Sequence, residues 1–267
     1  MTVLDWKDQS TWLHAVDAYA GDILDSTVRE HVLRRRSYCD SDDLTWLPSR
    51  TIQPSFVDAF VHYYSSIRAF HGCRPLDVAT YSRNGFVGHA AERLKKEFLD
   101  RFPHVPDEIL RLAAQELDIS RATERAKTWF VLTERELTEN CGSYIIHGSE
   151  YLAALAKGVS RLLRGIDYFY ELQNTGYPTI IEVELPVSYL PVPQLNSIAR
   201  EILSAWGRRI TKLGTSSTST PCVSIHQSLE PQYVVGHTHP KEVRDPYRML
   251  RRAMSPTTCP SCRASKA

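Results

Sequence analysis

The residues with the clearest capacity for chemistry lie between Ile67 and Phe86, where a short apolar run ends on the pair His71-Gly72. A histidine at the end of an apolar strand places an imidazole at the rim of a sheet, and glycine lets the backbone approach a ligand closely. Arg74 and Pro75 then indicate a turn, and a short helix is expected from Asp77 to Gly85. The same residues also fit a strand and a turn in which the histidine only bonds a neighbouring carbonyl.

Three later segments carry residues that could complete such a site. Trp129 and Phe130 lie in a buried-type strand predicted over 128–133. Ser149 is placed to cap a helix that carries Tyr151 in its first turn. Glu230 precedes a predicted strand at 233–235. Because strand alternation buries one of two adjacent residues, core packing also accounts for one of the two aromatic residues.

In this order the segments resemble the His-Tyr-Glu class of ADP-ribosyltransferases, which includes diphtheria-type toxins and poly(ADP-ribose) polymerases. That class places His-Gly-[Ser/Thr] and a basic residue on its first strand, and the chain reads His71-Gly72-Cys73-Arg74. A helix closing on glycine, an aromatic strand, a helix opening with serine and an aromatic residue, and an apolar strand at 180–185 follow in family order. The resemblance covers roughly residues 64–240. The sequence departs from the family at Cys73, which replaces serine or threonine, and at Glu230, which lies a residue or two before the expected catalytic acid.

The resemblance implies an α+β fold with a split-sheet ADP-ribosyltransferase-like domain and a helical N-terminal region. It implies His71, Tyr151 and Glu230 as catalytic residues and NAD as the substrate. The NAD-binding residues would be His71, Gly72, Cys73, Arg74, Trp129, Phe130, Ser149 and Tyr151. Breaking the nicotinamide–ribose bond builds an oxocarbenium-like cation that a nearby carboxylate stabilises. Gly72 would bond the carboxamide, His71 a ribose hydroxyl and Arg74 a phosphate.

A second group of residues suggests metal chemistry. Gly236-His237-Thr238-His239-Pro240 resembles the way JAMM-type zinc isopeptidases present two histidines, but Asp245 comes too soon to be their third ligand. Alternatively, these histidines and Cys259-Pro260-Ser261-Cys262 could form a structural zinc site. The composition favours a polar loop followed by an untethered tail, so no metal ligand is assigned.

Two further motifs are weaker. Glu182 and Glu184 share one face of a strand and resemble the Glu-x-Glu of arginine-type ADP-ribosyltransferases, and Ser217–Ser219 resembles that class's Ser-Thr-Ser. Their order is reversed relative to that class, so solvated strand charges are the preferred interpretation. No Gly-x-Gly-x-x-Gly, Walker loop or Gly-x-Ser-x-Gly motif is present.

Composition excludes several classes of function. The 267 residues carry a formal net charge of +1, which gives no global attraction to nucleic acid or membrane. The six cysteines show no disulfide framework, the N-terminus has no signal-peptide pattern, and no apolar run is long enough for a membrane span. These features predict a cytoplasmic protein with cysteines as thiols and no membrane partner.

The predicted elements set the domain organisation. Helices are expected at about 10–36, 54–67, 89–101, 106–117, 149–163 and 194–206, and strands at 67–72, 128–133, 143–148, 178–186, 223–226 and 233–235. Helices first and strands second, without βα alternation, favour an α+β class. We expect a helical region over 1–62, a catalytic domain over 63–247 and a C-terminal tail over 248–267.

These observations predict a toxin-like transferase that moves ADP-ribose from NAD to a macromolecular acceptor, either protein or nucleic acid. One alternative is a binding module that keeps this fold without transfer chemistry. Another is a zinc-stabilised interaction protein or a JAMM-like metalloenzyme. The sequence does not determine the acceptor.

Overall fold

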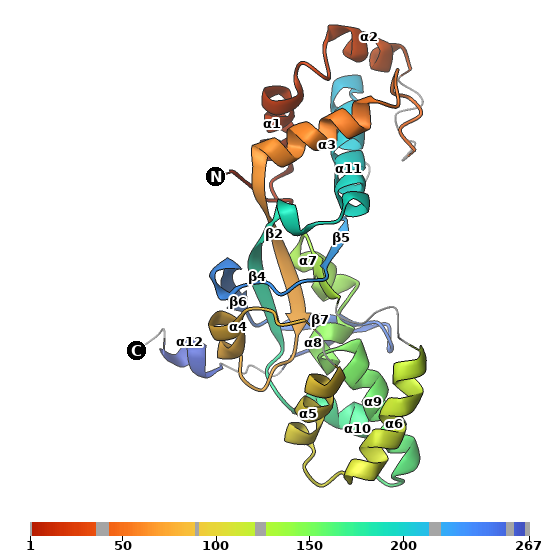
Figure 1. The fold of residues 1–267 in the computed structure, drawn as a ribbon, viewed down its shortest axis with the longest axis vertical. Helices are drawn as coiled ribbons and strands as arrows, with labels where there is room; N and C mark the ends of the chain where they lie inside the picture. The colour runs from red at the N-terminus through yellow and green to blue at the C-terminus, as the bar shows by residue number, and fades with distance from the viewer. Residues whose placement is uncertain are drawn as a thin grey trace. The chain divides into compact units, whose positions relative to one another are not determined.

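The computed structural model describes residues 2–35, 43–88, 91–120, 127–213, 220–254 and 259–264. The chain divides into two compact units, each assembled from segments far apart in sequence. Unit 1 comprises Met1–Arg68 and Glu184–Val223, and unit 2 comprises Ala69–Val183 and Ser224–Ala267. Helices occur together with a mainly antiparallel sheet (Figure 1), which confirms the predicted α+β class.

The main sheet has the hydrogen-bonded order β5-β3-β2-β4-β6, and β1 pairs in parallel with β2. Its strands are β1 (Thr2–Leu4), β2 (Tyr64–Cys73), β3 (Thr128–Val131), β4 (Thr179–Pro186), β5 (Cys222–Ile225) and β6 (Val234–Thr238). β3 runs antiparallel to β2 with Val131 opposite Phe70, and β6 runs antiparallel to β4 with His237 opposite Ile181. The central strand β2 is buried along most of its length, as its apolar sequence requires. His71, Gly72 and Cys73 are its last three residues.

Unit 1 is mostly helical. Its helices are α1 (Gln9–Ala20), α2 (Ser26–Arg34), α3 (Ile52–Tyr63), the 3₁₀ turn η4 (Val187–Tyr189) and α11 (Val192–Thr211). α11 packs against the other three α-helices and buries Trp206. The single helix predicted over 10–36 is wrong, because Asp25 accepts a hydrogen bond from Val28 N (2.9 Å) and starts a second helix.

Unit 2 contains a helical cluster and several short helices around the sheet. These elements are α4 (Ala79–Asn84), α5 (Ala91–Arg101), α6 (Asp107–Ser120), α7 (Glu134–Glu139), α8 (Ser143–His147), α9 (Glu150–Leu162), α10 (Tyr168–Glu171), η3 (Leu172–Asn174) and η5 (Pro231–Tyr233). α5, α6, α9 and α10 share a core that includes Phe98, Leu155 and Tyr168. At Gly158 a Cβ would lie 3.1 Å from Ala113 Cβ, so small residues allow α9 and α6 to pack closely.

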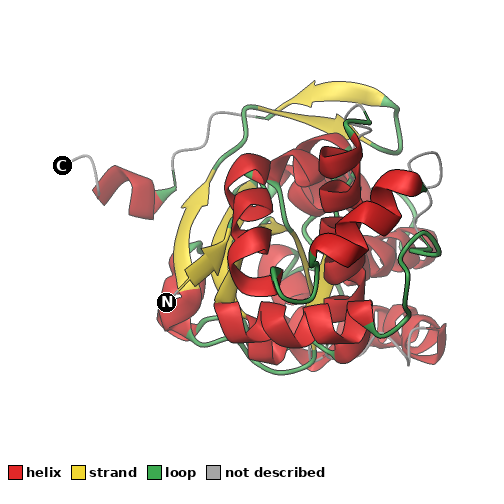
Figure 2. Ribbon diagram, turned by 90° about the horizontal axis from the view of Figure 1, so that it is seen from above, coloured by secondary structure: helices red, strands yellow, loops and turns green. Residues whose placement is uncertain are grey.

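Two predictions for unit 2 are wrong. Residues 143–147 form α8 rather than an extended segment, because Ile146 N donates to Gly142 O (3.0 Å) and Gly148 N donates to Tyr144 O (3.0 Å) in the helical pattern. Tyr144 and Ile145 pack against Gly72 from this helix. The tail after Met254 is not untethered throughout, because residues 260–264 form α12 (Pro260–Ala264) and Cys259 is fully buried. β7 (Glu242–Asp245) and β8 (Leu250–Ala253), which were not expected, form a separate two-stranded ribbon (Figure 2).

No helix among the described residues is long and apolar enough to cross a membrane. The described cysteines, Cys73, Cys141, Cys222, Cys259 and Cys262, are thiols rather than disulfides, as predicted. Cys39 and the Ser217–Ser219 motif lie outside the described residues.

Candidate functional site

His71 projects from the end of β2 into a group of aromatic rings. Its Nδ1 lies 2.8 Å from the carbonyl oxygen of Trp129. Because a carbonyl only accepts, Nδ1 carries the proton and Nε2 is unprotonated in the neutral ring. The ring packs edge-on against Phe86, with centroids 5.0 Å apart, and lies 5.7 Å from Phe130. The imidazole is therefore fixed in both orientation and tautomer.

Strand alternation in β3 separates the two aromatic residues predicted to line the site. Phe130 is buried at 1% exposure and packs on His71, whereas Trp129 is 43% exposed. The amine of Lys127 lies 6.0 Å from the Trp129 ring centroid. Of Trp129 and Phe130, therefore, only Phe130 belongs to the aromatic group around His71.

Gly72 and Cys73 are enclosed by protein. A Cβ on Gly72 would lie 3.0 Å from Leu137 Cδ2 and 3.2 Å from Tyr144 Cβ, so the small residue lets two short helices pack on β2. Burial raises the pKa of the Cys73 thiol to about 12, although a hydrogen bond with Tyr81 acts in the opposite direction. Cys73 is therefore a protonated, unreactive thiol at neutral pH.

Arg74 is a buried cation whose guanidinium donates hydrogen bonds to backbone carbonyls. Nε donates to the carbonyl of Thr175 (2.7 Å), Nη1 donates to that of Ile145 (3.4 Å), and Nη2 donates to that of Gln173. Burial lowers its pKa to about 10, and the neighbouring Arg101 acts in the same direction. The bonds to Gln173 and Thr175 fix the end of η3 against the end of β2, and the bond to Ile145 reaches α8.

The segment that carries Glu230 reaches the same region through backbone pairing. Phe86 N donates to Leu229 O (2.8 Å) and Leu229 N donates to Phe86 O (2.9 Å). Phe86 is the ring that packs edge-on against His71. The Glu230 side chain is exposed at the start of η5.

Ser149 and Tyr151 lie in the first turn of α9. Ser149 Oγ accepts a hydrogen bond from Leu152 N (3.1 Å), as its predicted capping role requires. Gly148 precedes it with a Cβ position 3.8 Å from Arg74 Cβ, so this segment also lies beside the end of β2. Tyr151 is half-buried and packs against the core shared by α5, α6, α9 and α10.

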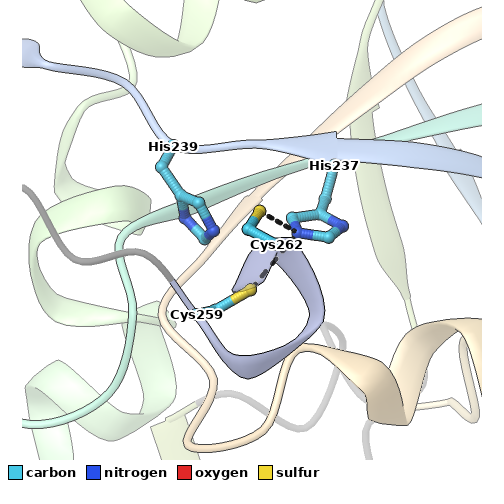
Figure 3. Close-up of side chains that lie close together, drawn as sticks. All are labelled: His237, His239, Cys259 and Cys262. Atoms are coloured by element: carbon cyan, nitrogen blue, oxygen red, sulfur yellow. Dashed lines mark hydrogen bonds between the residues drawn. The ribbon is translucent and has the colours of Figure 1, made fainter. Parts of the chain in front are cut away.

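A second group in unit 2 has the composition of a metal site (Figure 3). His237 and His239 come from β6 and the residue after it, and Cys259 and Cys262 come from the start of α12. Their candidate ligand atoms all lie within 4.8 Å of one another. His237 Nε2 is 3.2 Å from Cys262 Sγ and 3.4 Å from Cys259 Sγ. The side chains point toward a common centre.

The protonation of this group suits a cation. His239 Nδ1 lies 2.8 Å from the Pro178 carbonyl oxygen and therefore carries the proton. Burial lowers the pKa of His237, and His239 adds to this effect, so the neutral ring is favoured. Asp245, the acid considered for a JAMM-like site, instead accepts hydrogen bonds from Tyr247 N (2.9 Å) and Arg248 N (3.2 Å) in the β7–β8 turn.

The sequence analysis considered these four residues as a zinc site, but the polar composition after Met254 favoured an untethered tail that includes Cys259 and Cys262. The available signal was the occurrence of His-x-His and Cys-x-x-Cys within the last 31 residues, from His237 to Ala267. Scans against family models and searches of curated proteins and of solved structures found no match to this chain.

Proposed function

We propose that this protein is an ADP-ribosyltransferase with a split-sheet fold, which cleaves NAD at the nicotinamide–ribose bond and transfers ADP-ribose to a protein or nucleic acid in the cytoplasm. One observation carries the proposal: three segments of the resemblance lie around the end of β2. Phe86, which pairs with the residue before Glu230, packs on His71, and Gly148 lies beside Arg74. Residues that are 74 positions apart in sequence (Arg74 and Gly148) and 143 positions apart (Phe86 and Leu229) thereby reach one region.

The chemistry assigned to each residue follows from its setting. With Nδ1–H donated to Trp129 O, the Nε2 of His71 is an acceptor for a ribose hydroxyl. The exposed Glu230 carboxylate supplies the negative charge that stabilises an oxocarbenium-like ribosyl cation. For Tyr151 the role comes from the resemblance, which assigns it an aromatic face for the nicotinamide ring.

A second candidate is a binding module that keeps the fold without transfer. The hydrogen bonds of Arg74 to three carbonyls favour it, because they use the guanidinium that the resemblance assigns to a phosphate. The packing of Gly72 between side chains of α7 and α8 favours it as well. Such a module would bind NAD or its products through residues other than Gly72 and Arg74, without releasing nicotinamide.

The test incubates the full chain with NAD labelled in its adenylate part, together with cell lysate. Nicotinamide release and label on protein and RNA are measured separately. The enzyme should release nicotinamide, and His71→Ala and Glu230→Gln should each lower the rate by about 100-fold or more, because each removes a contact made to the transition state. His226→Ala, at an exposed histidine of the same unit, should leave the rate unchanged.

Two results would count against this proposal. Wild-type protein that neither releases nicotinamide nor labels an acceptor contradicts transfer itself. Activity that survives both substitutions contradicts the roles given to His71 and Glu230. Calorimetric NAD binding that is lost in His71→Ala, without any turnover in the wild type, would select the binding module.

A further inference from the structure

The C-terminal segment and β6 bring together four side chains whose types match a tetrahedral zinc site. Two residues apart on an extended chain, His237 and His239 project to the same face. Cys259 and Cys262 are three apart at the start of α12, where i and i+3 side chains lie on one side of a helix. Two imidazoles and two thiolates are the donor set of Cys₂His₂ zinc sites.

The distances agree with a shared metal. Zn–N bonds of 2.0–2.1 Å and Zn–S bonds of 2.3 Å at tetrahedral angles place neighbouring ligand atoms about 3.3–3.8 Å apart. The measured separations from His237 Nε2 are 3.2 Å to Cys262 Sγ and 3.4 Å to Cys259 Sγ. All four ligand atoms fall within 4.8 Å of each other, so small side-chain adjustments complete the tetrahedron.

His239 supplies an independent observation. Its Nδ1–H donates to Pro178 O, and its Nε2 is buried with no hydrogen-bond partner among the described residues. An unpaired buried nitrogen costs free energy unless something binds it. Metal-ligating histidines usually donate their other N–H to a carbonyl, which fixes the ring. The orphaned Nε2 of His239 thus faces the group as a ligand does.

We propose that His237, His239, Cys259 and Cys262 bind Zn²⁺ in a closed, structural site that fastens the C-terminal segment to β6. Four protein ligands leave no open position for water or substrate, so the metal is structural rather than catalytic. Binding converts two thiols to thiolates and releases two protons to solvent, which leaves the site neutral.

The local structure explains what the metal does. α12 has five residues, too few for a helix to be stable alone in water. Pro260 at its first position and the bond from Arg263 N to Cys259 O (3.2 Å) shape the turn that presents both sulfurs. A metal shared with β6 provides the long-range anchor that this short helix lacks.

The test measures metal directly on the full chain. Protein purified from zinc-supplemented culture without chelators or affinity tags should contain about one zinc per chain by mass spectrometry of its metals. After replacement by Co²⁺, the spectrum should show intense visible d–d bands of tetrahedral cobalt and a thiolate charge-transfer band. Cys259→Ser, Cys262→Ser and His239→Ala should each weaken Zn²⁺ binding more than 100-fold in competition with a chelating dye.

Matched controls use residues of the same types away from the group. Cys222→Ser and His226→Ala, both at exposed positions, should keep full zinc content. The proposal is overturned if folded wild-type protein carries less than about a tenth of an equivalent of zinc and shows no tetrahedral cobalt spectrum. It is also overturned if the group's cysteine variants bind as tightly as Cys222→Ser. Metal content does not depend on NAD turnover, so either proposal can fail without the other.

Discussion

At the scale of single residues, residue type left the role of a side chain open until its neighbours were known. Arg74 has the charge that a phosphate contact requires, yet its donors reach three backbone carbonyls. His71 bonds a neighbouring carbonyl, which was the simpler interpretation of the His-Gly pair, and the same bond fixes the tautomer that a catalytic role needs. In both cases the same atoms suit a structural and a functional role, and only the partners distinguish them.

His147 makes stability depend on pH. Its ring is 1% exposed and stacks on Phe169 with centroids 4.0 Å apart, and burial lowers its pKa from 6.5 to about 4. Asp245 raises this pKa, whereas Arg252 and Lys157 lower it. Between these pH values the unfolded chain binds a proton that the folded chain does not. The free energy of unfolding is therefore fully retained above pH 6.5. It falls by up to about 3 kcal/mol as the pH drops toward 4.

Urea unfolding of wild type and His147→Gln from pH 7 to pH 4 measures this effect. The variant should lose stability less steeply as pH falls. His226→Gln, which changes an exposed histidine, should follow the wild-type curve. Parallel curves for wild type and His147→Gln would show that His147 is not the titrating group.

At the scale of elements, short helices and turns are placed by single close contacts. Gly85 ends α4 with φ of +67°, and a Cβ there would lie 1.9 Å from Leu229 O. Glycine is required for the conformation and for the approach of the segment that precedes Glu230. The pairing of Phe86 with Leu229, the residue before Glu230, thus depends on one residue without a side chain.

Gly85→Ala should lower the free energy of unfolding by about 3 kcal/mol, because backbone strain and a clash with backbone add. Gly165→Ala is the matched control, since Gly165 has φ of +112° but no atom of the described residues within 4 Å of its Cβ position. That change should cost about 1 kcal/mol through strain alone. Equal losses in the two urea denaturation curves would contradict the role given to the Leu229 contact.

At the scale of the whole molecule, each compact unit combines distant parts of the chain, and unit 2 includes the C-terminal residues. The segment 259–264 contacts β6 through His237, His239, Cys259 and Cys262, the proposed zinc ligands. Its only regular element is the short helix α12. Its attachment should therefore depend on metal more than on apolar burial.

Chelation tests this dependence. At free zinc a thousandfold above Kd, binding stabilises the fold by about 4 kcal/mol. For a chain of this size, EDTA should lower the Tm of wild-type protein by roughly 10 °C. The Tm of Cys259→Ser/Cys262→Ser should be low from the start and insensitive to EDTA. An unchanged wild-type Tm after verified metal removal would show that the site contributes nothing to stability.

Local pattern was sufficient to predict most strands, the Ser149 cap and the α+β class, because alternation, periodicity and capping involve neighbours in sequence. Local pattern failed where contacts with residues distant in sequence determine the conformation. Residues 143–147 are helical beside Gly72, and a tail of polar composition places a fully buried cysteine against β6.

The amino-acid sequence by itself determined which residues could do chemistry: the imidazole of His71, the acid of Glu230, and the ligand pairs His-x-His and Cys-x-x-Cys. Only the tertiary structure decided which of them meet. Cys259 lies 3.4 Å from His237 although 22 positions separate them. Such proximity is set by sheet pairing and core packing, which sum contacts over the whole chain and leave no trace in the spacing of either motif.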